Sequence, residues 1–391
     1  PFYPYSANPP LQAYALALAI GALGLSEIAL HLACLPFSAL AVYAMYTLAR
    51  QLGGHGLFAA LLMLSTPVFL LSSHSVMADV PAMALSLLAI ALLLRGVEED
   101  RTGLLVAAGV AAGIAALFKY SGLSLLPLLG LYPLLKPRTR ALHFVPVGVA
   151  AALFGTWIVI DFSISGEIHV AAALLRETLQ PSTGTGGLQF AGNLMGLGAA
   201  TIFPPLLLAW SIAAARSTHR STGLAVGLVA AAAAGLLFVV MTTGGPLLAP
   251  EMASQLQYDV ENAILGALFL AAGSAALVFV AARGIYAVRM LSRPRLLGEE
   301  KPSLDPAVAV LLACWFLGLV AMNSLLVFAT PKYLLPGLAP LILLLIHPGG
   351  ASPGRFWTAP VGRTGIVATT LVLALALAWT AHVQSGFHQR A

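Results

Sequence analysis

The sequence predicts an all-α fold, a polytopic membrane bundle of about 12 transmembrane helices. Of the 391 residues, 60% are hydrophobic and only 8% are charged, whereas roughly a quarter of the residues in a soluble domain are charged. The length agrees, because about 12 spans of about 20 residues use roughly 240 residues. This composition excludes a soluble enzyme, a nucleic-acid reader and a disordered protein.

Apolar runs separated by polar, glycine or proline clusters give the expected spans in chain order. Residues 11–24 are short for a span and suit an interfacial or re-entrant helix. Residues 103–135 are too long for one span, and the polar segment 119–122 interrupts them, so we expect two short helices joined by a tight turn. The expected spans are 26–49, 56–73, 80–94, 103–118, 121–135, 143–161, 190–212, 223–242, 263–282, 306–328, 333–346 and 364–381.

The basic residues favour one orientation of this arrangement. With residues 1–25 outside and the spans alternating, the inner loops hold most of the 19 Lys and Arg residues, as the positive-inside rule requires. The basic pI near 9.4 therefore indicates which loops face the cytoplasm, not a nucleic-acid partner. The outer side keeps only Lys119, Arg176, Lys332 and Arg390.

Metal and disulfide chemistry are not expected. Cys34 and Cys314 each lie inside an apolar run without metal-ligand spacing, so both are expected to be small buried hydrophobic residues. The chain contains no zinc-protease, phosphate-loop or serine-hydrolase motif in a plausible context. Candidate functional residues must therefore be sought among the few charges at the outer ends of the helices.

An outer turn between two apolar helices carries the first candidates. Asp79 lies two residues before Pro81 at the start of a helix, where aspartate commonly caps the helix N-terminus. A charge at membrane depth is also costly unless it has a partner or a task, so a binding or acid–base role for Asp79 stays open. His74 in the same turn is either a ligand or an ordinary turn residue.

Two Lys-Tyr pairs lie on the outer side, against the positive-inside bias. Lys119-Tyr120 falls between two apolar helices, and Lys332-Tyr333 lies in the proline-flanked segment 331–336. Each pair can be an interfacial anchor with a snorkelling lysine. Each also suits a phosphate at the membrane surface, because lysine supplies a point charge and tyrosine a hydroxyl donor.

Five segments resemble, in order, the motifs of one family. They are Asn8–Tyr14 ("HPPLYY", with Asn for His), Gly24–Leu30 ("GLSEFALRL"), Ser72–Pro81 ("SRSALTDMP"), Ala116–Tyr120 ("LLTKG" or "LAKYT") and Pro331–Pro336 ("PRYLLP", with Lys for Arg). The chain thus resembles the bacterial GT-C glycosyltransferases of the dolichyl-phosphate-mannose–protein mannosyltransferase type. This group includes aminoarabinose transferases and RgtA/B/C/D-like sugar transferases.

The resemblance implies a GT-C fold and sugar transfer at the outer, periplasmic face of a bacterial inner membrane. The donor would be a sugar on a polyprenyl phosphate and the acceptor a lipid, glycan or protein, with no other cofactor firmly implied. Lys119, Lys332 and Tyr333 would bind the donor phosphate, where cations stabilise the charge that develops on the leaving group. Asp79 would be a candidate catalytic carboxylate, with His74 and Tyr120 as further site candidates.

The resemblance also implies a missing part. The family's principal catalytic aspartate precedes the "HPPLYY" segment, so it and the first span are expected upstream of residue 1, and the chain as given is expected to be inactive. Residues 1–391 would form one GT-C-like transmembrane domain. Its parts would be the remainder of the first outer loop with an interfacial helix (1–25), N-terminal spans (26–161), an outer loop (162–189) and C-terminal spans (190–391).

Two other classes remain as alternatives. A multi-pass transporter or flippase for a lipid-linked or anionic substrate should show two related halves with broken helices at the bilayer midplane. No such internal symmetry is visible, and the isolated charges gather at the outer surface instead. A non-catalytic membrane scaffold is the other alternative. A shared phosphate site requires Asp79, Lys119, Lys332 and Tyr333 to border one cavity open to the outer leaflet.

Overall fold

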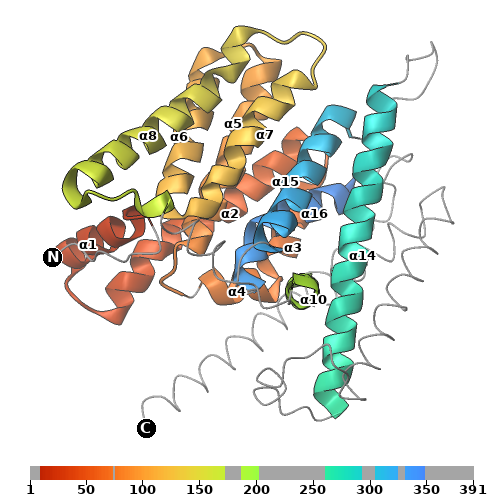
Figure 1. The fold of residues 1–391 in the computed structure, drawn as a ribbon, viewed down its shortest axis with the longest axis horizontal. Coiled ribbons are helices and arrows are strands. Elements are labelled where there is room, and N and C mark those ends of the chain that lie inside the picture. Colours follow the sequence, from red (N-terminus) through yellow and green to blue (C-terminus); the bar gives the residue numbers. More distant parts are fainter. Residues whose placement is uncertain are drawn as a thin grey trace.

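The structure is a computed structural model, and it describes residues 9–73, 75–171, 186–201, 260–292, 304–324 and 331–347. Every regular element in these ranges is a helix, which confirms the predicted all-α class (Figure 1). Five of the helices are long and apolar enough to cross a membrane, and four shorter apolar helices accompany them. The expected spans 223–242 and 364–381 lie outside the described residues, as does His74.

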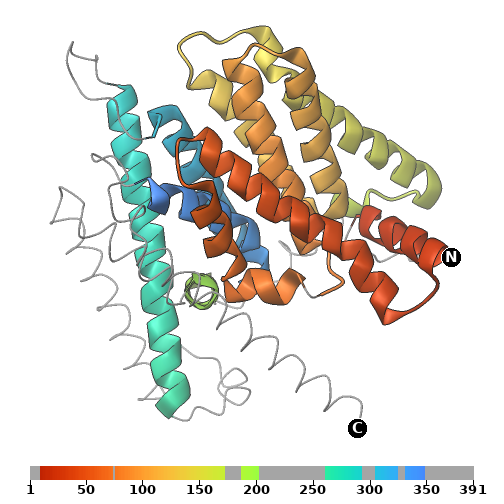
Figure 2. The same cartoon turned by 180° about the vertical axis from the view of Figure 1, so that it is seen from behind.

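The chain enters through two helices joined at a glycine. Helix α1 (Leu11–Leu23) ends at Gly24, whose φ of 81° permits the reversal into α2 (Glu27–Gln51). Ser26 caps α2, because its hydroxyl oxygen accepts the backbone N–H of Ala29 at 3.1 Å. Figure 2 shows α2 running obliquely across the bundle with α1 beside its N-terminal half.

The expected span 56–73 is broken into two helices. Helix α3 (Gly56–Leu64) ends before Pro67, which begins α4 (Pro67–Ser73). Proline has no N–H to continue the helical ladder. At the break, the hydroxyl of Ser65 donates to the Leu61 carbonyl at 2.9 Å, and that of Thr66 donates to the Met63 carbonyl at 2.6 Å. The two hydroxyl groups at the break are thus hydrogen-bonded to backbone carbonyls inside an apolar environment.

The stretch 103–135 is divided as predicted. Helix α6 (Thr102–Phe118) stops at Lys119, whose backbone is extended, and the short 3₁₀ helix η1 (Tyr120–Ser124) leads into α7 (Leu125–Leu134). Helix α5 (Asp79–Glu98) precedes this unit. The 3₁₀ helix η2 (Ala141–Phe144) and helix α8 (Val145–Ser165) follow it.

Close packing between α6 and α8 depends on two glycines. A Cβ atom on Gly109 would lie 2.6 Å from the Pro146 carbonyl oxygen, and one on Gly113 would lie 2.9 Å from Leu153 Cδ1. Both distances are shorter than a normal van der Waals contact, so only glycine permits this approach. This agrees with the small-residue packing typical of membrane helices.

The C-terminal part packs against the N-terminal helices and completes the core. It comprises α10 (Gly186–Thr201), α14 (Val260–Leu291), α15 (Pro306–Ser324), the 3₁₀ helix η3 (Pro331–Leu334) and α16 (Leu335–Ile346). Trp315 and Phe316 of α15 and Tyr132 of α7 are among its largest fully buried side chains. Helix α16 is buried along its whole length, so the segment that follows η3 is firmly held.

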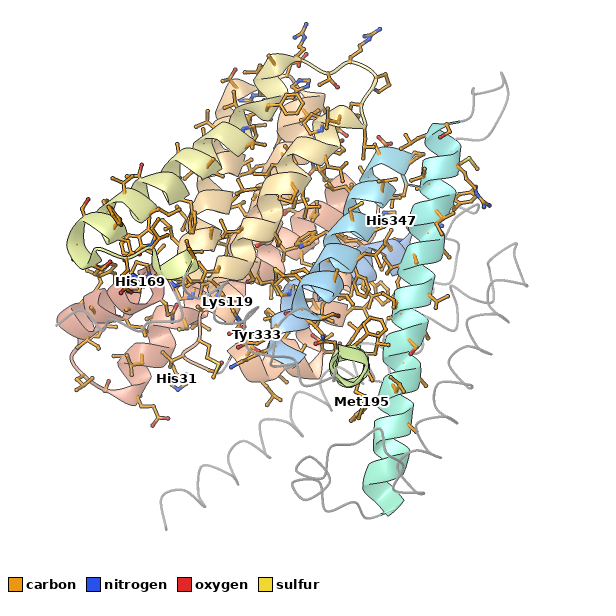
Figure 3. The ribbon with its side chains drawn as sticks, viewed as in Figure 1. His31, Lys119, His169, Met195, Tyr333 and His347 are labelled. Carbon is orange, nitrogen blue, oxygen red and sulfur yellow. The ribbon has the colours of Figure 1, made fainter. Side chains whose placement is uncertain are left out.

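Polar side chains gather at the two ends of this bundle. At one end, Lys136 contacts Asp305 at 2.5 Å, and Asp100 contacts His143 at 2.7 Å and Arg140 at 2.9 Å. Lys119 and Tyr333 lie at the opposite end (Figure 3). Helices α5, α6, α7 and α8 thus alternate in direction between these two ends, while α10 runs across them (Figure 1). Which end faces the periplasm stays a prediction.

One expectation about the cysteines is wrong. Cys34 is buried, but Cys314 is exposed on α15. It lines a largely apolar cavity of about 330 Å³ between α7 and α15, together with Ser124, Trp315 and Met322. In a membrane helix an apolar residue is as stable on the lipid side as in the core, so hydrophobicity did not reveal which way Cys314 points.

Candidate functional site

An ion pair between α5 and the end of α6 forms the centre of the candidate site. The Lys119 ammonium donates a short hydrogen bond to Asp79 Oδ1. Both side chains are largely buried, with 14% and 7% of their surface exposed. A buried charge is costly without a partner, and here each group supplies the partner of the other. The two residues stand 40 positions apart, so the fold alone brings them together.

This pairing argues against the N-cap interpretation of Asp79 and against the snorkelling interpretation of Lys119. The N-cap of α5 is Ala78, without a side-chain capping bond, while Asp79 is the first helical residue and directs its carboxylate to Lys119. Asp79 is therefore not a simple N-cap. Lys119 is not a snorkelling residue with its ammonium free in solvent, because it is buried and paired. In this geometry Asp79 fixes the position of Lys119 rather than presenting a free carboxylate.

The segment 331–334 brings the second Lys-Tyr pair to the same place. The Lys119 Nζ atom lies 4.3 Å from the centroid of the Tyr333 ring, a cation–π distance. The Nζ atom of Lys332 lies 5.7 Å from that ring and contacts Met77 Sδ at 3.8 Å. Figure 3 shows Lys119 and Tyr333 side by side. The two lysines thus converge on one aromatic ring from distant segments.

The electrostatics of Lys119 reflect this crowding. Lys119 lies between α6 and η1, outside the helical spans. Its pKa is lowered first by burial, the Asp79 carboxylate opposes that change by attraction and a hydrogen bond, and the positive charge of Lys332 lowers the pKa further. Among the described residues, Lys119 is paired with Asp79, and Lys332 contacts Met77 and the Tyr333 ring. Two lysines and one carboxylate thus lie around this ring, a balance of charge that suits a bound anion.

Of the remaining sequence candidates, the structure describes Tyr120 but not His74. Tyr120 directs its ring to Phe154 of α8, with the ring centroids 6.2 Å apart in an edge-to-face arrangement. This contact gives Tyr120 a packing role between η1 and α8. His74 lies outside the described residues. No group of three or more metal-ligating side chains occurs in the parts of the chain that the structure describes.

The structure adds polar groups that the sequence argument did not single out. Asn323, in the last turn of α15, donates from Nδ2 to the Tyr333 carbonyl oxygen at 3.2 Å. At the end of α8, His169 Nδ1 contacts both carboxylate oxygens of Asp161 at 2.9 Å. An amide within the apolar run of α15 was a visible signal for Asn323, while the Asp161–His169 pair had no motif to mark it.

The part of the chain that contains the Asp79–Lys119 pair is similar to a known protein family. Residues 7–162 match one protein-family model. It is that of the dolichyl-phosphate-mannose-protein mannosyltransferases. The matched range contains the Asp79–Lys119 pair, and it confirms the resemblance to the mannosyltransferase family over these residues. Lys332 and Tyr333 lie beyond the matched range. The family's name describes the transfer of mannose from dolichyl phosphate to protein.

Two solved structures are similar to the chain at low identity. Both are of ArnT from Cupriavidus metallidurans. The crystal structure bound to undecaprenyl phosphate shows 21% identity and a TM-score of 0.43, and the apo structure shows 20% and 0.40. Each alignment covers 88% of this chain and 68% of the other. No curated protein matches the chain.

Proposed function

We propose that this protein is a membrane glycosyltransferase that moves a sugar from a polyprenyl-phosphate carrier to a hydroxyl acceptor at the periplasmic face of a bacterial inner membrane. One observation carries the proposal: Lys119 and Lys332 converge on Tyr333 at one end of the bundle, where Lys119 is also paired with the Asp79 carboxylate. The mannosyltransferase match over residues 7–162 supports the reaction class. Undecaprenyl phosphate, the ligand of the similar ArnT structure, has the chemistry that this cluster suits.

The charge balance of the reaction fits two lysines. The acceptor oxygen bonds to the anomeric carbon of the sugar, and the bond from that carbon to the phosphate oxygen breaks. The donor is a phosphodiester with one negative charge, whereas the leaving polyprenyl phosphate is a monoester that gains charge as the bond breaks. Cations placed at that oxygen stabilise the transition state more than the ground state.

The acceptor proton needs a separate base. A carboxylate that already accepts a hydrogen bond from an ammonium is a weaker base than a free one. Asp79 is held in this way by Lys119. We therefore assign Asp79 the positioning of Lys119, and the acceptor proton passes to a group other than Asp79.

The phosphate site is tested by binding. Purified protein in lipid nanodiscs is titrated with undecaprenyl phosphate, and the Lys332→Ala variant is compared with Arg140→Ala, which removes one positive charge at the opposite end of the bundle. We expect Lys332→Ala to weaken binding about 5- to 10-fold, which is less than the loss of a buried charged hydrogen bond causes, because Lys332 is partly exposed. Equal affinities for the two variants would contradict the site.

The reaction itself is tested by product. The purified protein is given a polyprenyl-phosphate-linked sugar and a mixture of lipid, glycan and protein acceptors. Release of polyprenyl phosphate together with a sugar-bearing acceptor supports transfer. Movement of the intact donor across a vesicle membrane, without cleavage, would instead support the flippase alternative.

A further inference from the structure

Asn323 is an uncommon residue for its position. It lies one residue before the end of α15, a helix rich in Val, Leu and Ala, and only 1% of its surface is exposed. Burying an amide costs free energy unless hydrogen bonds replace those to water. Its presence in an otherwise apolar helix face therefore calls for a reason beyond hydrophobic packing.

The side-chain amide of Asn323 donates a hydrogen bond to the segment that carries the second Lys-Tyr pair. Asn323 Nδ2 donates to the backbone carbonyl of Tyr333 at 3.2 Å. Tyr333 is the third residue of η3, a 3₁₀ helix of four residues, too short to be rigid by itself. The bond therefore ties η3 to the end of a long helix at the residue whose ring faces Lys119.

The other end of the amide argues against a purely stabilising role. Asn323 Oδ1 is buried and has no hydrogen-bond partner among the described residues. An unsatisfied buried acceptor lowers stability, roughly cancelling the gain from one neutral hydrogen bond. An apolar side chain of similar size would fill the same space without that penalty. Stability alone does not explain asparagine here.

A second polar contact anchors the same point from another helix. Ser324 donates to the Val320 carbonyl at 2.8 Å, and Asn193 Nδ2 of α10 donates to the Ser324 hydroxyl oxygen at 3.4 Å. Helix α10 also packs directly against η3. The end of α15 is thus also held by α10, which makes it a firm support for the Tyr333 carbonyl.

We propose that Asn323 is a positioning residue of the phosphate site: its amide fixes the Tyr333 carbonyl and thereby sets the distance between Lys332, the Tyr333 ring and Lys119. The inference rests on the proposed function in one respect, that the anion bound there is a polyprenyl phosphate. Asn323 acts through η3 and does not itself contact the phosphate.

The test separates positioning from stability. Asn323→Leu removes the donor and keeps a similar volume, and Ser86→Ala is the matched control, because Ser86 is a buried polar residue of α5 that bonds only its own helix, to Ala82 at 2.7 Å. For each variant the melting temperature and the dissociation constant for undecaprenyl phosphate are measured in nanodiscs. We expect Asn323→Leu to keep or raise the melting temperature and to weaken binding about 2- to 10-fold. Ser86→Ala should leave the dissociation constant unchanged.

A double variant shows whether the effect passes through η3. If Asn323 acts by placing Lys332, then Asn323→Leu should weaken binding less in a Lys332→Ala background than in the wild type, whereas a general structural effect would multiply in both. Asn323→Gln, which keeps an N–H donor, should bind more tightly than Asn323→Leu, and it replaces the leucine variant if that does not fold.

The outcomes distinguish this inference from the function on which it rests. Wild-type affinity in Asn323→Leu would overturn the positioning role and leave the phosphate site intact. So would a loss of binding that follows a fall in melting temperature and is independent of Lys332. A wild-type protein that binds undecaprenyl phosphate but transfers no sugar would remove the proposed function and leave the role of Asn323 standing.

Discussion

The Asp79–Lys119 pair gives the sharpest prediction about stability. Replacing Lys119 with Met keeps most of the side-chain volume and leaves the Asp79 carboxylate buried without its cation. The exposed fractions of 14% and 7% place both groups mostly out of water, so little solvent screening reduces the loss. Removing one partner of a buried pair typically costs about 3–5 kcal/mol. We expect a loss of this size in the free energy of unfolding of Lys119→Met.

The double variant Asp79→Leu/Lys119→Met completes the argument. With both charges gone, no buried charge is left unpaired, and replacing a buried pair by apolar side chains is often neutral or stabilising. We therefore expect the double variant to unfold within about 1 kcal/mol of the wild type while its binding of undecaprenyl phosphate is lost. Unfolding is followed by far-ultraviolet circular dichroism during titration of mixed micelles with sodium dodecyl sulfate. Independent, additive losses from the two single substitutions would refute a buried, mutually compensating pair.

Two further predictions concern other parts of the fold. Gly109→Ala should lower the free energy of unfolding by about 1–3 kcal/mol, because the new Cβ atom meets the Pro146 carbonyl. The control Gly148→Ala in α8 should have little effect, since nothing lies within 4 Å of a Cβ atom there. Equal losses in the two variants would contradict close packing between α6 and α8. At the opposite end, the hydrogen bond from His143 comes first among the causes that lower the pKa of Asp100. A carboxyl group whose pKa is lower in the folded than in the unfolded protein adds stability at a pH above its unfolded-state pKa, and this stability is lost as the pH falls through its folded-state pKa. The melting temperature of Asp100→Asn should therefore change less between pH 6 and pH 3 than that of the wild type.

Much of the fold followed from the sequence because membrane helices are marked by length and by what interrupts them. The polar break at Lys119 was visible among apolar residues, and the structure ends α6 there. The division of 56–73 at Pro67 was missed, although proline marked it, because the run is apolar throughout. Hydropathy is nearly the same on the lipid and core sides of a helix, which is why the exposure of Cys314 was not predicted.

The site was only partly predictable. The residue types pointed to phosphate, but the contacts depend on chain segments that meet only in the fold, since Lys332 and Met77 are 255 positions apart. The pairing of Asp79 with Lys119 could not be foreseen from spacing, and it changed the role assigned to the carboxylate. The amide of Asn323 was visible in an apolar run, but its partner was not, because a hydrogen bond to the Tyr333 backbone carbonyl does not depend on the side chain of that residue.

The carboxylate beside Lys119 also bears on turnover. Product release limits many enzymes, and here the product would carry more negative charge than the substrate. A site of two free ammonium groups would hold such a product tightly. In the proposed site Asp79 already pairs with one of them, so a bound phosphate would share Lys119 with this carboxylate, and the repulsion would grow with the charge on the phosphate. The pair that joins α5 to the end of α6 would then also keep the spent carrier from remaining bound.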